Sequence, residues 1–158
     1  MIHVKAARGQ RWNNGVSNEE ETVMYAHILV PVSFDEERDA KGAMRVAEVL
    51  AEHSAKITLF HVIEQIPSYA AAYLPDGYLK ERKTALQGKL ESAVEGMENA
   101  AAVVVDGHAG RSIVEYASTH RVDCIVVAGH RPGMQDLLLG STAHYVVRHA
   151  ACAVHVLR

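Results

Sequence analysis

The chain has 158 residues, of which 49% are apolar and 6% aromatic, and a formal net charge of −3 with its histidines neutral. This length suits one domain with a real core, and this charge excludes the basic surface typical of proteins that bind nucleic acid or anionic membranes. No run approaches the ~20 apolar residues of a membrane span, and no apolar run follows the N-terminal charges as in a secretory signal. We therefore expect a cytoplasmic protein with no nucleic-acid or membrane partner.

The first 23 residues differ from the rest of the chain. They are polar, contain Asn13-Asn14-Gly15 and an acidic run at Glu19 to Glu21, and show no periodicity. This composition predicts a disordered or non-native tail, residues 1–23, before a single domain formed by residues 24–158.

From residue 25 onward, short apolar runs alternate with segments of helical apolar spacing. We expect strands over 27–32, 56–63, 101–105, 123–128 and 153–157. We expect helices over 35–55, 79–98, 111–120 and 141–149. Such alternation predicts a single-domain α/β protein, a three-layer sandwich around a five-stranded parallel sheet in the order 3-2-1-4-5, of the flavodoxin- or Rossmann-like type. In that order strands 1 and 4 flank the switch point, where ligands bind beyond the carboxyl ends of the strands.

A glycine-bearing segment after the fourth strand carries the strongest functional signal. Gly129-His130-Arg131-Pro132-Gly133 is followed by Gly140-Ser141-Thr142, which opens the last predicted helix. Free backbone N–H groups and the dipole of a helix N-terminus favour phosphate, and Arg131 can add a charge. A plain loop with a helix cap explains the same residues equally well. The pattern is not a P-loop, because no Lys precedes the hydroxyl residue.

Three segments resemble the universal stress protein family. They are ILVPVSFDEE, ITLFHVIEQ and VVAGHRPGMQDLLLGSTAHYVVRHAACAVHVLR, and the resemblance covers residues 25–158. It implies a homodimeric fold of the adenine nucleotide alpha hydrolase-like type, of which many members bind ATP. The short HRP loop resembles one branch of that family.

The resemblance also implies the positions of a nucleotide site. Gly129 matches the first glycine of the family's binding loop and Gly140-Ser141 its last pair, whereas Pro132 replaces the middle glycine. Ser33 stands where ATP-binding members usually have Asp; serine cannot supply charge, and such a loss typically costs ~1–3 kcal/mol. The implied nucleotide-binding residues are Pro31, Val32, Ser33, Val62, Gly129, His130, Arg131, Gly140, Ser141 and Thr142. Among them Pro31 and Val32 form an apolar wall, and the backbone of Val62 faces adenine.

Neither catalytic residues nor metal ligands stand out. Ser141 lacks an assigned base, His144 and His149 do not share a helix face, and Asp35 is a candidate Mg²⁺ ligand only if it does not serve the helix dipole. Cys124 and Cys152 lie in apolar runs and have no partner at metal or redox spacing, so we expect buried free thiols.

Three functions remain open at this point. The first is a stress-response module that binds an adenine nucleotide, ATP above all, with or without Mg²⁺. The second, favoured by Ser33 and Pro132, is a nucleotide-independent dimeric interaction protein; the third is a slow ATPase or self-phosphorylating protein. In either of the first two, the apolar edge strand over 153–157 is expected to pair with the same strand of a second chain, which closes a homodimer.

Overall fold

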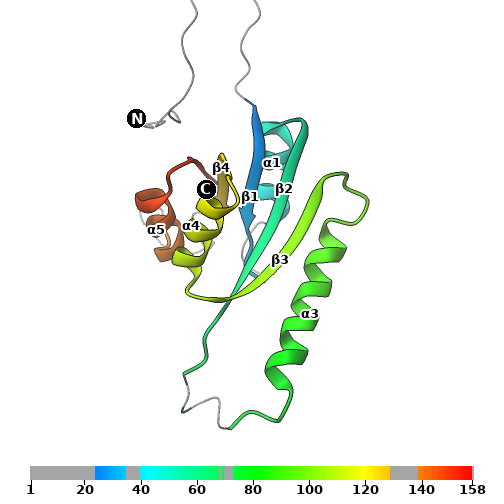
Figure 1. The fold of residues 1–158 in the computed structure, drawn as a ribbon, viewed down its shortest axis with the longest axis vertical. Coiled ribbons are helices and arrows are strands. Elements are labelled where there is room, and N and C mark those ends of the chain that lie inside the picture. Colours follow the sequence, from blue (N-terminus) through cyan, green and yellow to red (C-terminus); the bar gives the residue numbers. More distant parts are fainter. Residues whose placement is uncertain (1–23, 35–39, 68, 70–72, 129–138, 158) are drawn as a thin grey trace, which may run out of the picture.

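The computed structural model describes residues 24–34, 40–67, 69, 73–128 and 139–157, and the predicted tail of residues 1–23 lies outside them. Five strands form one parallel sheet in the order β3-β2-β1-β4-β5, which confirms the predicted fold class and strand order (Figure 1). The elements are β1 (Tyr25–Pro31), α1 (Ala40–Leu50), β2 (Ala51–Glu64), α3 (Tyr78–Ala93), β3 (Ala100–Gly107), α4 (Ala109–Thr119), β4 (Cys124–Ala128), α5 (Ser141–His149) and β5 (Ala153–Leu157).

The alternation of side chains along β1 divides the interior into two cores. Ile28 and Val30 point to the face covered by α1 and α3, whereas Leu29 points to the face covered by α4 and α5, and all three are 0% exposed. Successive strand residues face opposite sides of a sheet, so an unbroken apolar run is what a strand covered on both faces requires. None of the described helices is long and apolar enough to cross a membrane.

The largest differences from the predicted element boundaries lie where two helices end. The helix predicted over 35–55 ends at Leu50, and β2 begins at Ala51 rather than at residue 56, because the apolar spacing of the helix stops there and Ala51 pairs with Tyr25 before the register shifts. The helix predicted over 79–98 ends at Ala93, and a turn follows in which Gly96 (φ 80°) and Asn99 (φ 62°) adopt left-handed conformations. Glycine and asparagine tolerate this region of φ better than other residues.

The two edge strands of the sheet, β3 and β5, differ in how their outer sides are covered. At β3, side chains of α3 reach the edge strand: Gln87 Nε2 donates to the Ala102 carbonyl at 3.2 Å, and Lys83 forms an ion pair with Asp106. At β5, the strand pairs with β4 through all five of its residues. The described residues provide no comparable polar cover on the outer side of β5.

Helices α4 and α5 pack side by side at Gly110. A Cβ atom built there would lie 2.8 Å from Cδ1 and Cγ of Tyr145 and 2.9 Å from its Cβ. Because these distances are shorter than any normal contact, the approach of the two helices depends on the missing side chain.

We expect Gly110→Ala to destabilise the protein, because α4 and α5 must separate. Overpacking of this kind costs ~1–3 kcal/mol, which exceeds the gain of up to about 1 kcal/mol from removing a helical glycine. Gly88→Ala is the matched control: nothing lies within 4 Å of the added Cβ, so stability should rise by about 0.5–1 kcal/mol. Urea unfolding of both variants measures the difference, and equal shifts would contradict the packing argument.

Candidate functional site

The carboxyl edge of the sheet contains a step beside β1. Strand β1 ends at Pro31, which lies opposite Phe60, whereas β2 and β3 stay paired as far as Glu64 and Gly107. Residues of β2 beyond Phe60, Val62 among them, therefore have no β1 residue alongside. The extension of β2 past the end of β1 is visible in Figure 1.

On its other side, β1 separates from β4. Only Ile28 with Cys124 and Leu29 with Ile125 are paired between these strands. The N–H of Val32 bonds toward β2, so the nitrogen of the preceding Pro31 faces β4, and proline has no hydrogen to donate there. Proline thus ends this ladder at the switch point between β1 and β4, the place where sheets of this type bind ligands beyond the carboxyl ends of their strands.

The segment after β1 is held against β2 by backbone and side-chain contacts. Val32 N–H donates to the Phe60 carbonyl at 2.9 Å, and His61 Nδ1–H donates to the Val32 carbonyl at 2.9 Å. The ring of Phe34 lies 4.8 Å from the ring of His61, and Lys89 Nζ of α3 lies 5.7 Å from the centre of the Phe34 ring. Four predicted residues, Pro31, Val32, Ser33 and Val62, are thereby brought to one place.

Helix α5 begins at the same edge, because it leads from the end of β4 back to the start of β5 (Figure 1). Gly140 is its N-cap residue with φ −57° and ψ 152°, and its carbonyl accepts from His144 N–H at 2.8 Å. Ser141 is exposed and Thr142 half-buried in the first turn. This helix end offers N–H groups and a partial positive charge at the carboxyl edge of the sheet. Gly129, His130 and Arg131 lie outside the described residues, as do Asp35 and Pro132.

The sequence prediction missed His61, Phe34 and Lys89. The available signal was His61 itself, a titratable residue inside the otherwise apolar run ITLFHVI. Phe34 and Lys89 carried no signal, because their contact joins the end of β1 to a helix more than 50 residues away and needs the fold to be seen.

A second polar cluster lies at the opposite, amino-terminal edge. The Asp123 carboxylate accepts from the backbone N–H groups of Ala26 and His27 at 2.9 and 3.0 Å. His27 Nδ1–H donates to the His120 carbonyl at 3.2 Å, so Nε2 accepts from the Thr58 hydroxyl at 2.9 Å. Thr58 is the one fully buried polar side chain of the described residues. Every partner here belongs to the protein, so the cluster is structural.

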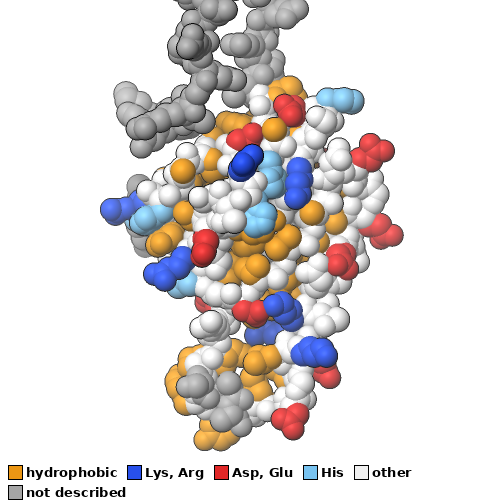
Figure 2. All heavy atoms as spheres, viewed as in Figure 1, with side chains coloured by type: hydrophobic (Ala, Val, Ile, Leu, Met, Phe, Trp, Pro, Cys, Tyr) orange, Lys and Arg blue, Asp and Glu red, His pale blue; other side chains and the backbone are white. Residues whose placement is uncertain are grey.

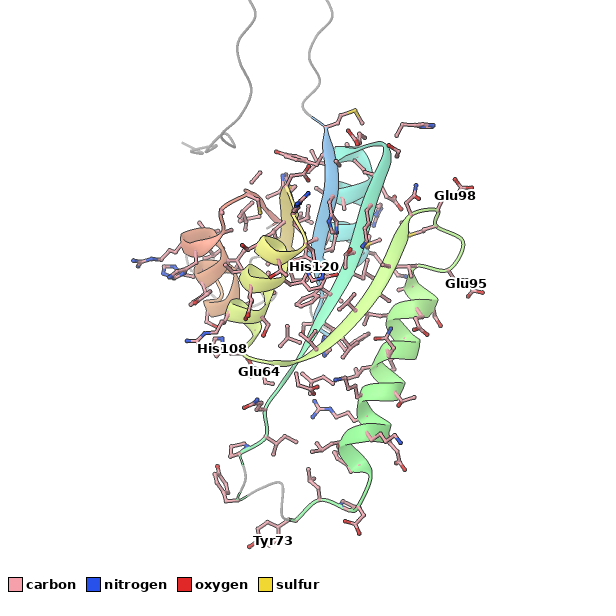
Figure 3. The ribbon with its side chains drawn as sticks, in the orientation of Figure 1. Glu64, Tyr73, Glu95, Glu98, His108 and His120 are labelled. Carbon is pink, nitrogen blue, oxygen red and sulfur yellow. The ribbon has the colours of Figure 1, made fainter. Side chains whose placement is uncertain are left out.

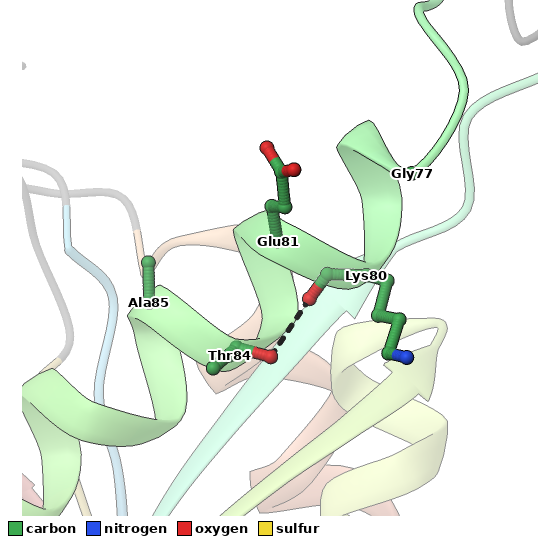
Figure 4. A pocket seen from close by; sticks show the side chains of 5 residues that line it. All are labelled: Gly77, Lys80, Glu81, Thr84 and Ala85. Atoms are coloured by element: carbon green, nitrogen blue, oxygen red, sulfur yellow. Dashed lines mark hydrogen bonds between the residues drawn. The ribbon is translucent and has the colours of Figure 1, made fainter.

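The remaining candidates carry no comparable arrangement. A shallow hollow lies at the N-terminal half of α3 (Figure 4). It is lined by Gly77, Lys80, Glu81, Thr84 and Ala85. Tyr73, at the tip of the β2–α3 connection, is 89% exposed and points away from the sheet (Figure 3). Hydrophobic side chains gather at that tip in Figure 2. No cluster of metal-ligating side chains occurs in the described part of the chain.

The cysteines behave as the sequence predicts, as free thiols. Cys124 is buried and Cys152 half-buried. Burial raises the pKa of the Cys124 thiol to about 12, and the neighbouring Cys152 and Asp123 add to the effect. A thiol of this kind is protonated and inert at neutral pH.

A parallel sheet in the order 3-2-1-4-5, with a helix N-terminus at the carboxyl edge, defines the doubly wound α/β proteins, which bind ligands at the switch point of that edge. The chain belongs to the universal stress protein family, whose sequence profile matches residues 24–158. It is 33% identical over 142 residues to universal stress protein A homolog 2 of Coxiella burnetii, which covers 85% of this chain and 95% of that protein.

Solved structures of the family share the fold. Universal stress protein UspA from Lactobacillus plantarum superposes with a TM-score of 0.63 at 28% identity, covering 85% of this chain and 99% of that one. A universal stress protein in complex with cAMP gives a TM-score of 0.56 at 22% identity, with 85% and 98% covered. The Archaeoglobus fulgidus protein in complex with dAMP gives 0.54 at 18% identity, with 85% and 99% covered.

We expect protonation of His27 to destabilise the fold. Burial lowers the pKa of His27, nearby Lys56 and His120 lower it further, and the His120 carbonyl and Asp123 partly oppose this. The folded state therefore binds this proton less readily than the unfolded state, and stability falls as the pH drops below the ordinary histidine pKa of 6.5.

Urea unfolding at pH 7.5 and 5.5 tests this expectation. The unmodified chain should lose more stability between the two pH values than His27→Gln, which keeps all other histidines. Equal losses in the two proteins would show that His27 does not carry the effect.

Proposed function

We propose that the protein binds an adenine nucleotide, with ATP as the expected ligand, at the switch point between β1 and β4. The observation that carries the proposal is the meeting of two features at one edge: the step beside Val62 and the N-terminus of α5. An apolar wall next to backbone polar groups suits a base, and a helix N-terminus suits phosphate. The cAMP and dAMP complexes of related proteins support this class of ligand.

The ligand is expected to lie with its base toward β2 and its phosphates toward α5. Pro31 and Val32 then flank the base, Ser33 lies at the ribose, and Gly140, Ser141 and Thr142 meet the phosphates. Gly129, His130 and Arg131 are assigned to the same site from the sequence. At this position a carboxylate would bind two groups of the ligand, whereas Ser33 contributes at most one neutral hydrogen bond. A moderate affinity is therefore expected. Mg²⁺ would accompany the phosphates rather than a set of protein carboxylates.

A binding module agrees better with these features than an enzyme does. The positions named above offer hydrogen bonds and shape, which is what recognition needs, and a hydrolytic step would also need a general base within reach of a water. We therefore place the protein among stress-response modules that respond to nucleotide, and its cytoplasmic location remains a prediction of the sequence.

A second candidate function is nucleotide-independent assembly through β5. Val154 and Val156 pack toward the α4–α5 core, Ala153 and Leu157 toward the other core, and His155 is exposed. An apolar edge strand of this kind is suited to pairing with a copy of itself about a two-fold axis. The same surface serves a nucleotide-binding homodimer, so the two candidates differ only in whether the switch point is used.

Purified protein should release an adenine nucleotide on heating, or bind ATP in calorimetry, and Gly140→Val should abolish that binding. Gly140 has φ −57°, which valine adopts without strain, so the fold persists while the added side chain blocks close approach of phosphate. Gly88→Val on α3, where nothing lies within 4 Å of an added Cβ, is the control and should bind as the unmodified chain does. Unchanged affinity of Gly140→Val would refute a phosphate site at α5.

Light scattering should give a mass near twice the chain's 17.3 kDa at micromolar concentration. Val156→Pro removes a backbone donor from β5 and should yield a monomer. Gly88→Ala, on the other side of the molecule, should remain a dimer. A monomeric unmodified chain would exclude pairing through β5.

A further inference from the structure

The parallel ladder between β1 and β2 lacks one hydrogen bond that a regular ladder would contain. Val32 follows Pro31, the last residue of β1 paired with β2, and its N–H donates to the Phe60 carbonyl, which continues the register by one residue. In a regular parallel ladder the Val32 carbonyl would then accept from the Val62 N–H. No hydrogen bond between these two groups occurs among the described residues.

The imidazole of His61 occupies that place. A carbonyl oxygen only accepts, so Nδ1 carries the hydrogen of the 2.9 Å bond to Val32. The Val32 carbonyl thus accepts from a side chain of β2, and no bond from the Val62 N–H accompanies it. In a parallel strand the N–H and C=O of one residue point the same way, so both polar groups of Val62 face the step beside β1.

The imidazole is itself held in place. The centres of the Phe34 and His61 rings lie 4.8 Å apart with a 60° tilt, and Lys89 Nζ lies over the Phe34 ring, 5.7 Å from its centre. These contacts tie the His61 ring to the segment after β1 and to α3. The ring therefore has little freedom to release the Val32 carbonyl.

We propose that His61 is a positioning residue for base recognition: it holds the Val32 carbonyl so that the Val62 N–H and C=O remain open to the edge of the base. This inference rests on the proposed nucleotide function and deepens it. A neighbouring donor and acceptor on one backbone match adenine, whose N1 accepts and whose N6 donates. Guanine presents the reverse order, with a donor at N1 and an acceptor at O6, so the same backbone discriminates against it.

Two substitutions at His61 distinguish the effect of its hydrogen-bond donor from the effect of its side-chain volume. His61→Asn places an amide Nδ2–H close to the position of Nδ1 and should keep the bond to Val32. His61→Leu has a similar volume and no donor, so the Val62 N–H should close onto the Val32 carbonyl. Thermal unfolding of both variants establishes that each is folded before binding is measured.

Calorimetry with ATP and GTP gives the first readout. His61→Leu should lose about tenfold or more in ATP affinity, the effect of one lost hydrogen bond, while GTP affinity changes little. His61→Asn should keep ATP affinity and the preference for ATP within about threefold. A variant that merely loosened the structure would weaken both nucleotides equally, and that result would overturn the proposal.

Amide hydrogen exchange of Val62, measured by NMR without nucleotide, gives the second readout. The Val62 amide should exchange faster in the unmodified chain and in His61→Asn than in His61→Leu, where the ladder bond protects it. Equal exchange in all three proteins would overturn the positioning role. If the unmodified chain binds neither nucleotide, the proposed function fails, and this exchange experiment still decides the role of His61.

Discussion

The structure depends on the confinement of β1. This strand is enclosed on both edges by β2 and β4 and on both faces by helices, and Ile28, Leu29 and Val30 are fully buried as a result. Burying three such side chains stabilises the fold by about 1.5–3 kcal/mol each. Asp123 fixes the start of the strand by accepting from its first backbone donors. The two cores, the order of the strands and the level at which the carboxyl edge lies all follow from where β1 begins and ends.

The two ends of the sheet use polar groups in opposite ways. At the amino-terminal edge, Asp123, His27 and Thr58 bond to one another and to the backbone, which rigidifies the strand starts. At the carboxyl edge, Pro31 ends one ladder, and the Val32 carbonyl accepts from the side chain of His61. The proposed role of this edge in ligand binding depends on backbone groups that are directed away from the ladder.

Much of the fold follows from the sequence alone. Unbroken apolar runs predict buried parallel strands, and both α5 and β5 have the predicted bounds, with Gly140 at the start of α5. The predicted start of β2 was wrong. Residues 51–55 have no strong preference for helix or strand, and pairing with β1 decides their conformation. Motif spacing selected the site residues, but the His61–Val32 bond joins residues 29 apart and depends on register, which spacing does not reveal.

The unequal edges of the sheet set a limit on growth. On β3, Gln87 occupies the outward carbonyl of Ala102, and Lys83 places a charged side chain at Asp106, and both features disfavour pairing with an incoming strand. If β5 paired with its copy as proposed, the resulting ten-stranded sheet would end in a β3 strand at each side. The side chains of α3 that lie along β3 would then oppose the addition of further chains.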